Sequence, residues 1–549
     1  MTHQVKALAA GPVWGWRLLS FIAALFVCLP LVSAIWLATT SDGAFWGHLG
    51  STVLPRYIST TLKLMAGTGL LTALFGLVSA WLIVWFDFPG RRHFSWALML
   101  PFAFPAYVIA FVYTDFLEYA GALQAGLRAL FGWSSPNDYW FPEIRSLGGA
   151  VAMFSLVLYP YVYLTSRAAM MDLSANLFLA SRSLGRGFFG TLWHVLLPAV
   201  RPGLAVGLAL VLMETLNDFG TVDFFAVQTL TAGLFDTWLN LGDVGGAAQI
   251  AVSMVTFALL LIWLEQFSRR KVRVWQSRTP VSHKRVVLRG APAWLACLFC
   301  TLLVVLGFLL PGGILLVYAV QYAAESWTPE FLVYARNSIL LSATSGLMLV
   351  FTGLLLAYTQ RLTRDRLTLT LNKVATVGYA MPGAVLAVGV IIPLAAFDNW
   401  LSDLAESWWG LSTGLLLSGS MFAILYAYNA RFMAVAVGSA EAGLNRITPS
   451  MDQAARTLGH RPAAILRRVH LPILKKSLFT AGLIVFVDCM KELPATLILR
   501  PFNFETLATY VYQFASDEQL EQSALAALII VAAGLIPVLI LNRASMQRA

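Results

Sequence analysis

Apolar runs recur along the whole chain and are separated by short polar segments. A run of about 20 residues, wound as a helix, spans the roughly 30 Å of hydrocarbon in a bilayer. Twelve runs qualify, and we predict a transmembrane helix in each. They lie at residues 18–38, 61–86, 94–116, 148–168, 200–220, 246–266, 293–321, 338–358, 374–397, 412–436, 477–499 and 523–542. The pattern therefore predicts an all-α polytopic membrane protein.

Composition supports membrane lipid as the surroundings of this chain. Of its 549 residues, 59% are hydrophobic and 12% are charged, whereas soluble proteins carry about 25% charged residues. The net charge of +10 does not indicate a nucleic acid partner, because the basic residues recur between apolar runs and form no single face. The first run is longer than the core of a signal peptide, about 7–15 residues, so we expect a retained helix.

Charge in the loops predicts the orientation. Residues 269–289 contain eight Lys or Arg and no acid, and basic residues of this kind mark cytoplasmic loops. Alternate loops lean acidic, among them residues 398–406 and 505–521. We therefore expect both termini and the central linker on the cytoplasmic side of a bacterial inner membrane. The basic run of the linker is interpreted as a topology anchor and not as a partner site.

The chain also matches itself at half its length. Seven identities fall within 25 positions at an offset of 274: Ala180, Arg182, Leu184, Gly185, Leu197, Pro198 and Leu204 align with Ala454, Arg456, Leu458, Gly459, Leu471, Pro472 and Leu478. At an offset of 277, Pro105-Ala106 corresponds to Pro382-Gly383. We predict a first half at residues 1–275, a basic linker at 276–291 and a second half at 292–549. Six spans per half make the repeats parallel, related by a pseudo-two-fold axis along the membrane normal.

The matched loops are called here the first elbow (residues 177–198) and the second elbow (residues 451–472). Each predicts a short helix, a turn at Gly185 or Gly459, and a second short helix ending in Leu-Pro. Glycine lets the backbone reverse direction. Pro198 and Pro472 suit the start of the next membrane helix, where the missing N–H has no cost.

This arrangement resembles the EAA loop, E-A-A-x3-G-x9-I-x-L-P, of permeases in binding-protein-dependent ABC importers. The two copies begin Leu179-Ala180-Ser181 and Gln453-Ala454-Ala455, with the family's spacing kept. Leu179 and Gln453 replace the usual Glu, so Arg182 and Arg456 are expected to carry more of the polar contact with the ATPase. The residues expected to dock the ATPase are Ala180, Arg182, Gly185, Pro198, Ala454, Arg456, Gly459 and Pro472.

The resemblance implies a fused pair of permease domains that moves substrate inward by alternating access. It also implies two copies of a cytoplasmic ABC ATPase and a periplasmic substrate-binding protein as partners. No GxxxxGK[ST] pattern occurs, so ATP is expected on the partner subunit and no cofactor on this chain. Residues 213–220 and 491–496 look most like ferric-iron importers. Thiamine, polyamine and phosphonate importers remain alternatives.

Four acids lie within predicted helices, where a carboxylate costs about 2.5–3.5 kcal/mol. Glu214 and Asp218 are spaced i, i+4, as are Asp488 and Glu492, and the pairs correspond at offset 274. One hypothesis is that all four line the pathway and contact a hard cation such as Fe3+ transiently. The other is that they cap or brace helix breaks near Gly220 and Pro494. The candidate pathway or gate residues are Glu214, Asn217, Asp218, Asp488, Lys491 and Glu492, with the four acids as the transient metal contacts.

Two other protein classes fit the sequence less well. A major-facilitator transporter also has twelve helices, but residues 86–92 echo its loop motif only faintly, and it would not repeat an EAA loop. A membrane enzyme is disfavoured because the seven histidines show no ligand spacing. Five tyrosines in the predicted helices four and ten are expected to be interfacial aromatics rather than iron ligands; they are Tyr159, Tyr161, Tyr163, Tyr426 and Tyr428.

Overall fold

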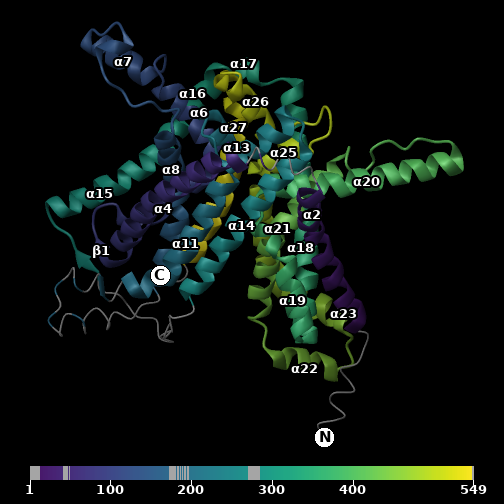
Figure 1. The fold of residues 1–549 in the computed structure, drawn as a ribbon. Helices are drawn as coiled ribbons and strands as arrows, with labels where there is room; N and C mark the ends of the chain where they lie inside the picture. Colours follow the sequence, from purple (N-terminus) through teal and green to yellow (C-terminus); the bar gives the residue numbers. More distant parts are fainter. Residues whose placement is uncertain are drawn as a thin grey trace. The chain divides into compact units, whose positions relative to one another are not determined.

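A computed structural model describes residues 13–40, 47, 50–171, 197–269 and 285–546, with positions 181, 185, 187, 190, 193 and 194. Helices dominate these residues (Figure 1), and η denotes short 3-10 or π turns. The first half contains α2 (Val13–Thr40), α4 (Leu54–Trp85), β1 (Phe86–Asp87), α5 (Arg91–Ala97), η1 (Leu100–Ala103), α6 (Ala106–Leu117), α7 (Ala122–Phe131), η2 (Pro136–Asp138), α8 (Leu147–Met171), α11 (Leu197–Asn217), α12 (Gly220–Phe224), α13 (Leu230–Phe235), η4 (Asp236–Asn240) and α14 (Val244–Arg269).

The second half has the same character. It contains β2 (Val286–Val287), α15 (Ala291–Val304), η5 (Val305–Leu309), α16 (Leu310–Gln321), α17 (Ala323–Ser326), α18 (Pro329–Thr363), α19 (Arg366–Ala375), η6 (Val377–Ala380), α20 (Gly383–Trp409), α21 (Met421–Leu444), α22 (Pro449–Thr457), α23 (Pro462–Ile465), η7 (Leu466–His470), α24 (Leu471–Lys491), α25 (Pro494–Leu499), α26 (Leu507–Ser516) and α27 (Leu520–Met546). β1 and β2 pair in parallel over two residues each.

Ten helices in the described part of the chain are long and apolar enough to cross a membrane. They coincide with ten of the twelve predicted spans. The third predicted span is instead two helical stretches, Arg91–Ala103 (α5 and η1) and Ala106–Phe131 (α6 and α7), bent by 91°. The eleventh falls on α24, whose charges at both ends, Lys475 and Lys476 near the start and Asp488 and Lys491 near the end, lower its apolar character. The all-α polytopic class is confirmed.

The chain forms two compact units that exchange segments between the halves. Unit 1 consists of Met1–Gly43, Thr237–Val255 and Leu332–Thr509, and unit 2 of Ala44–Asp236, Thr256–Phe331 and Tyr510–Ala549. Each unit thus holds four central spans of one half together with end helices of the other. In unit 1, for example, α2 lies against α20 closely enough that a Cβ at Gly389 would collide with the Pro30 backbone. The predicted boundaries at 275 and 292 describe the covalent repeat and stay a prediction.

Matched contacts inside each unit show that the repeat extends through the helices. Leu230 N donates to Thr61 Oγ1 at 3.0 Å, and Leu507 N donates to Ser338 Oγ at 2.7 Å. Both partners are shifted by 277. These hydrogen bonds hold the segment after the fifth or eleventh span onto the start of the second or eighth. The two units therefore place their central helices in the same way.

The third spans are the main exception to this repeat. α6 ends at Leu117 and the chain then forms the separate helix α7, whereas α20 continues unbroken to Trp409. α20 extends away from the other helices of unit 1 (Figure 1). It ends at Gly410, whose left-handed φ of 64° terminates the helix.

Candidate functional site

Both acid pairs lie where a membrane helix is interrupted. α11 ends at Asn217 and α12 begins at Gly220, while α24 ends at Lys491 and α25 begins at Pro494. We call residues 218–219 the first break and residues 492–493 the second break. Every boundary is shifted by 274. Pro494 has no N–H to continue the hydrogen bonding of α24, and the same interruption in the first half occurs without proline.

The second acid of each pair caps the short helix that follows. Asp218 Oδ1 accepts a hydrogen bond from Thr221 N at 2.8 Å, and Glu492 Oε1 accepts one from Ala495 N at 3.3 Å. A carboxylate bonded to the N–H three residues later is the usual way to satisfy the open end of a helix. The bracing hypothesis therefore has direct geometric support at Asp218 and Glu492.

The second break also contains a buried ion pair. Arg431 Nη1, on α21, lies 2.7 Å from Glu492 Oε1, and the two side chains are 8% and 5% exposed. A Cβ on Gly383, at the start of α20, would collide with both charged atoms. Tyr428 Oη lies 2.5 Å from Thr496 Oγ1 and completes the polar cluster. Three helices, α20, α21 and α24, thus meet at this pair.

The remaining predicted pathway residues are distributed along the same helix ends. Asn217 is buried, and Glu214, Asp488 and Lys491 are half-buried, each with interaction partners. No group of three or more His, Cys, Asp or Glu among the described residues could hold a metal ion. The assignment of the four acids as transient metal contacts stays a prediction.

The turn glycine and the proline of the two elbows have the same backbone placement. Gly185 and Gly459 both have φ of 79°, a left-handed conformation that favours glycine. Pro198 and Pro472 are each the second residue of the following membrane helix. In the second elbow, α22, the Gly459 turn and α23 confirm the predicted helix–turn–helix. Ala180 and Arg182 of the first elbow lie outside the described residues.

The second elbow presents the predicted docking residues to solvent. Ala454, Arg456 and Gly459 are exposed, whereas Ala455 packs inward. Leu458, directly before the turn glycine, is 77% exposed. α22, which carries Ala454 and Arg456, lies below α19 in the view of Figure 1.

Three polar residues outside the motif attach this elbow to its unit. Arg361, near the end of α18, donates to Asp452 Oδ2 at 2.8 Å and to the carbonyls of Leu444 and Ile447 at 2.6 and 2.8 Å. His470 Nε2 lies 2.6 Å from Asp452 Oδ1. Burial alone raises the pKa of Asp452, but hydrogen bonds from Arg361 and His470 outweigh it and leave this pKa below its ordinary value.

Sequence reasoning missed Arg361, Asp452 and His470 as a group. Asp452 precedes the motif by one residue and His470 lies two residues before Pro472, so both belong to the segment that the sequence analysis considered. Neither belongs to the motif pattern, and Arg361 is 91 residues away from Asp452. Only the packing of α18 against the elbow brings them together.

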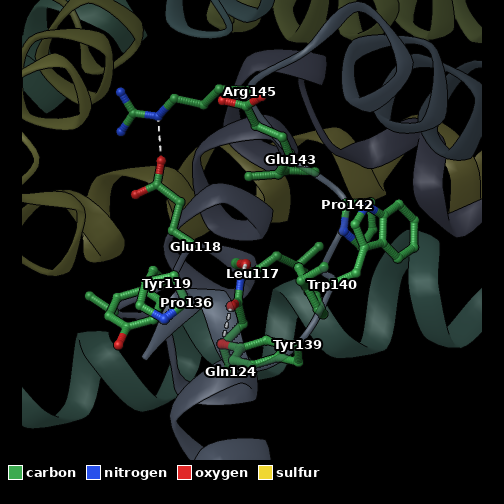
Figure 2. A pocket seen from close by; sticks show the side chains of 13 residues that line it. Leu117, Glu118, Tyr119, Gln124, Pro136, Tyr139, Trp140, Pro142, Glu143 and Arg145 are labelled. Carbon is green, nitrogen blue, oxygen red and sulfur yellow. Dashed lines mark hydrogen bonds and ion pairs between the residues drawn. The ribbon is translucent and has the colours of Figure 1, made fainter. Parts of the chain in front are cut away.

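A pocket in unit 2 was also not predicted. It has a volume of about 630 Å³ and is formed by residues 117–145, between the end of α6 and the start of α8 (Figure 2). Glu118 pairs with Arg145 on one side. On the other side Tyr139 Oη donates to Gln124 Oε1 at 2.6 Å. Trp140, 86% exposed, stands at its margin.

The expectation that the tyrosines are interfacial is wrong for most of them. Tyr159, Tyr163, Tyr426 and Tyr428 are buried inside their units. Tyr163 Oη donates to Ser95 O at 2.8 Å and Tyr426 Oη to Phe26 O at 2.6 Å. Hydrogen bonds to backbone carbonyls satisfy the phenol groups away from water. These two tyrosines join helices within a unit.

Comparison with known proteins finds a matching family model and several similar permeases. Residues 72–274 match the family described as binding-protein-dependent transport system inner membrane component. The chain is 25% identical over 97% of its length to the Fe(3+)-transport system permease protein FbpB 2 of Haemophilus influenzae, covering 98% of that protein. It is 22% identical over 90% of its length to the ferric transport system permease protein FbpB of Actinobacillus pleuropneumoniae, covering 72% of it. A probable sulfate transport permease of Chlorokybus atmophyticus is 28% identical, but over 46% of this chain and 86% of its own length.

Proposed function

We propose that this chain, a permease of the binding-protein-dependent ABC importer family, carries ferric iron from the periplasm to the cytoplasm by alternating access. The observation that carries the proposal is the end-to-end similarity to a permease named for Fe(3+) transport, which includes both halves. The sulfate-type relative aligns with about half of the chain. Full-length correspondence therefore favours the ferric assignment over an oxyanion.

The chemistry of the helix ends supports a cation as cargo. Glu214, Asp218 and Asp488 put carboxylate oxygens near two helix breaks, and hard oxygen donors suit a hard trivalent ion. Desolvated carboxylates would repel sulfate or molybdate. Weak successive contacts are needed, because a complete cage of ligands would retain the ion.

The loop charges indicate how the chain is oriented in the membrane. We propose that the elbows and both termini face the cytoplasm, where basic loops concentrate, and that the two breaks lie toward the periplasm. In this family the ATPase is a separate subunit, and a binding protein supplies substrate from outside. Two elbows on one chain imply two ATPase copies, one for each elbow. ATP binding and hydrolysis then favour inward- and outward-open states in turn.

Reconstitution tests the cargo directly. The chain, its ATPase and its binding protein are placed in proteoliposomes, with the binding protein enclosed or added on the elbow-free side. We expect ATP-dependent uptake of radiolabelled ferric iron, and no uptake of thiamine, polyamine, phosphonate, sulfate or molybdate. Tight binding of one of these other compounds by the binding protein, with matching uptake, would assign a different cargo to the same importer.

A further inference from the structure

The two helix breaks differ at three aligned positions. In the second half these are Gly383, Arg431 and Glu492, and in the first half they are Ala106, Val157 and Asp218. The correspondence is set by structure as well as by sequence. Pro105 and Pro382 both precede a helix in extended backbone, with ψ of 143°. α8 and α21 begin at Leu147 and Met421, 274 residues apart.

The three differences depend on one another. Arg431 and Glu492 occupy the space that a Cβ at Gly383 would need, so the ion pair requires glycine there. In the first half Ala106 has that Cβ, and Val157 is an uncharged residue that is 3% exposed. Asp218 is one methylene shorter than Glu492. A buried guanidinium needs a buried carboxylate, and a buried valine does not.

The ion pair with Arg431 occupies the carboxylate of Glu492. Glu492 is 5% exposed in its side chain, is 2.7 Å from a guanidinium and also caps α25. A passing cation would have to displace Arg431 to reach it. Asp218 is half-buried, its carboxylate interacts with the backbone of Thr221 and Val222 at the start of α12, and the position aligned with Arg431 is an uncharged valine.

We propose that Arg431 is a positioning residue that commits Glu492 to bracing the second break, so that cargo is contacted by Asp218 of the first half and not by Glu492. The corresponding acids of the two halves thus have different roles, cargo contact for Asp218 and bracing for Glu492. This inference rests on the proposed function in one respect, the cationic cargo. The bracing role of the pair stands on geometry alone.

The test uses the full chain assembled with its ATPase and binding protein. Arg431→Met leaves a buried carboxylate uncompensated, and we expect the thermal midpoint to fall by about 5 °C or more. Arg431→Met combined with Glu492→Gln removes both charges, and we expect the midpoint and iron uptake to return to within about twofold of the unmodified chain. Val157→Met, the matched change in the first half, controls for the new side chain.

Asp218→Asn completes the comparison. Asparagine caps a helix as well as aspartate does, so the midpoint is expected to stay within about 2 °C. Uptake is expected to fall roughly tenfold, because a charged contact to the cargo is lost. Arg431→Glu combined with Glu492→Arg restores the ion pair with the two charges exchanged. This variant tests the same proposal if the uncharged pair fails to fold.

Two results would overturn the proposal. One is a stable Arg431→Met, Glu492→Gln protein whose uptake is still lost, because Glu492 would then act on the cargo. The other is normal uptake by Asp218→Asn. The thermal midpoint and the ATP hydrolysis stimulated by the binding protein test the bracing role of the Arg431–Glu492 pair, whatever the cargo is. A wrong cargo assignment would show separately, as absence of iron uptake by the unmodified chain.

Discussion

The two elbows share a left-handed turn glycine and differ in sequence at the positions that attach the second elbow. Gly185 and Gly459 have the same φ of 79°, yet the residues that hold the second elbow have no polar equivalents in the first. Arg361, Asp452 and His470 align with Val84, Phe178 and Leu196, of which Phe178 and Leu196 lie outside the described residues. Duplication has therefore kept the turn glycine of the elbow, while the sequence at the positions that attach the second elbow has diverged.

The helix breaks differ in the same sense. In both places the second half contains an ion pair within one unit, the partly buried pair of Arg361 with Asp452 and the buried pair of Arg431 with Glu492. The aligned arginine positions in the first half are valines, Val84 and Val157, which are 5% and 3% exposed. Buried ion pairs add directional constraint more than net stability. We infer that Arg361 and Arg431 add directional constraints to the second half that the valines at the aligned positions of the first half cannot supply.

Arg361→Ala is expected to have the largest effect on this contrast. It removes the donor to Asp452 and to two carbonyls, and it leaves a partly buried carboxylate without its guanidinium. We expect the thermal midpoint to fall by about 5 °C and ATP hydrolysis to lose its response to the binding protein. Arg364→Ala, an exposed neighbour, is the control. Equal behaviour of the two variants would show that the elbow is not held by Arg361.

Leu458→Asp is expected to come second. Leu458 is 77% exposed, so the change leaves the permease stable but places a charge in an apolar contact. We expect ATPase binding to weaken by about tenfold or more. Leu184→Asp makes the matched change in the first elbow. A surface restrained by Arg361 and Asp452 loses less conformational freedom on docking, so we expect the larger loss of ATPase affinity at the second elbow. A larger loss of affinity with Leu184→Asp would contradict this expectation.

Replacing the turn glycines is expected to have a smaller effect, equal in both elbows. Gly185→Ala and Gly459→Ala meet no neighbouring atom within 4 Å, so the cost is that of a left-handed alanine, about 1 kcal/mol. The thermal midpoint should fall by about 2–4 °C in each variant. Gly438→Ala, within helix α21 and equally unobstructed, should stabilise slightly. Unequal losses would mean that the two turns are not equivalent.

The pH response of the second elbow should be the smallest effect. The folded pKa of Asp452 is lowered, so its contribution to stability is present above the ordinary aspartate pKa, about 3.9. That contribution is lost as pH falls through the lowered value. The difference in thermal midpoint between the unmodified chain and Asp452→Asn should therefore shrink as the pH falls below about 4, where the aspartate of the unmodified chain gains a proton. A difference that shrinks near neutral pH would contradict it.

Much of the fold and part of the site could be predicted before the structure. The membrane spans depend on runs of apolar side chains, and the elbow on the spacing of glycine and proline, so both are local signals. The acid pairs were recognisable because charge within a span is costly. Their roles were not, since the capping of Thr221 and Ala495 by Asp218 and Glu492 depends on where each helix breaks.

The sequence by itself determined that this is a duplicated polytopic permease with two elbows and two acid-bearing helix ends. The hydrophobic pattern and the local backbone preferences act over a few turns of helix, so they can be recognised from a short segment of the sequence. The tertiary structure decided the exchange of end helices between units, the pairing of Arg431 with Glu492 and the attachment of the second elbow. Arg431 and Glu492 are 61 positions apart in the sequence, and Arg361 and Asp452 are 91 positions apart. Only the packing of whole helices brings such residues together.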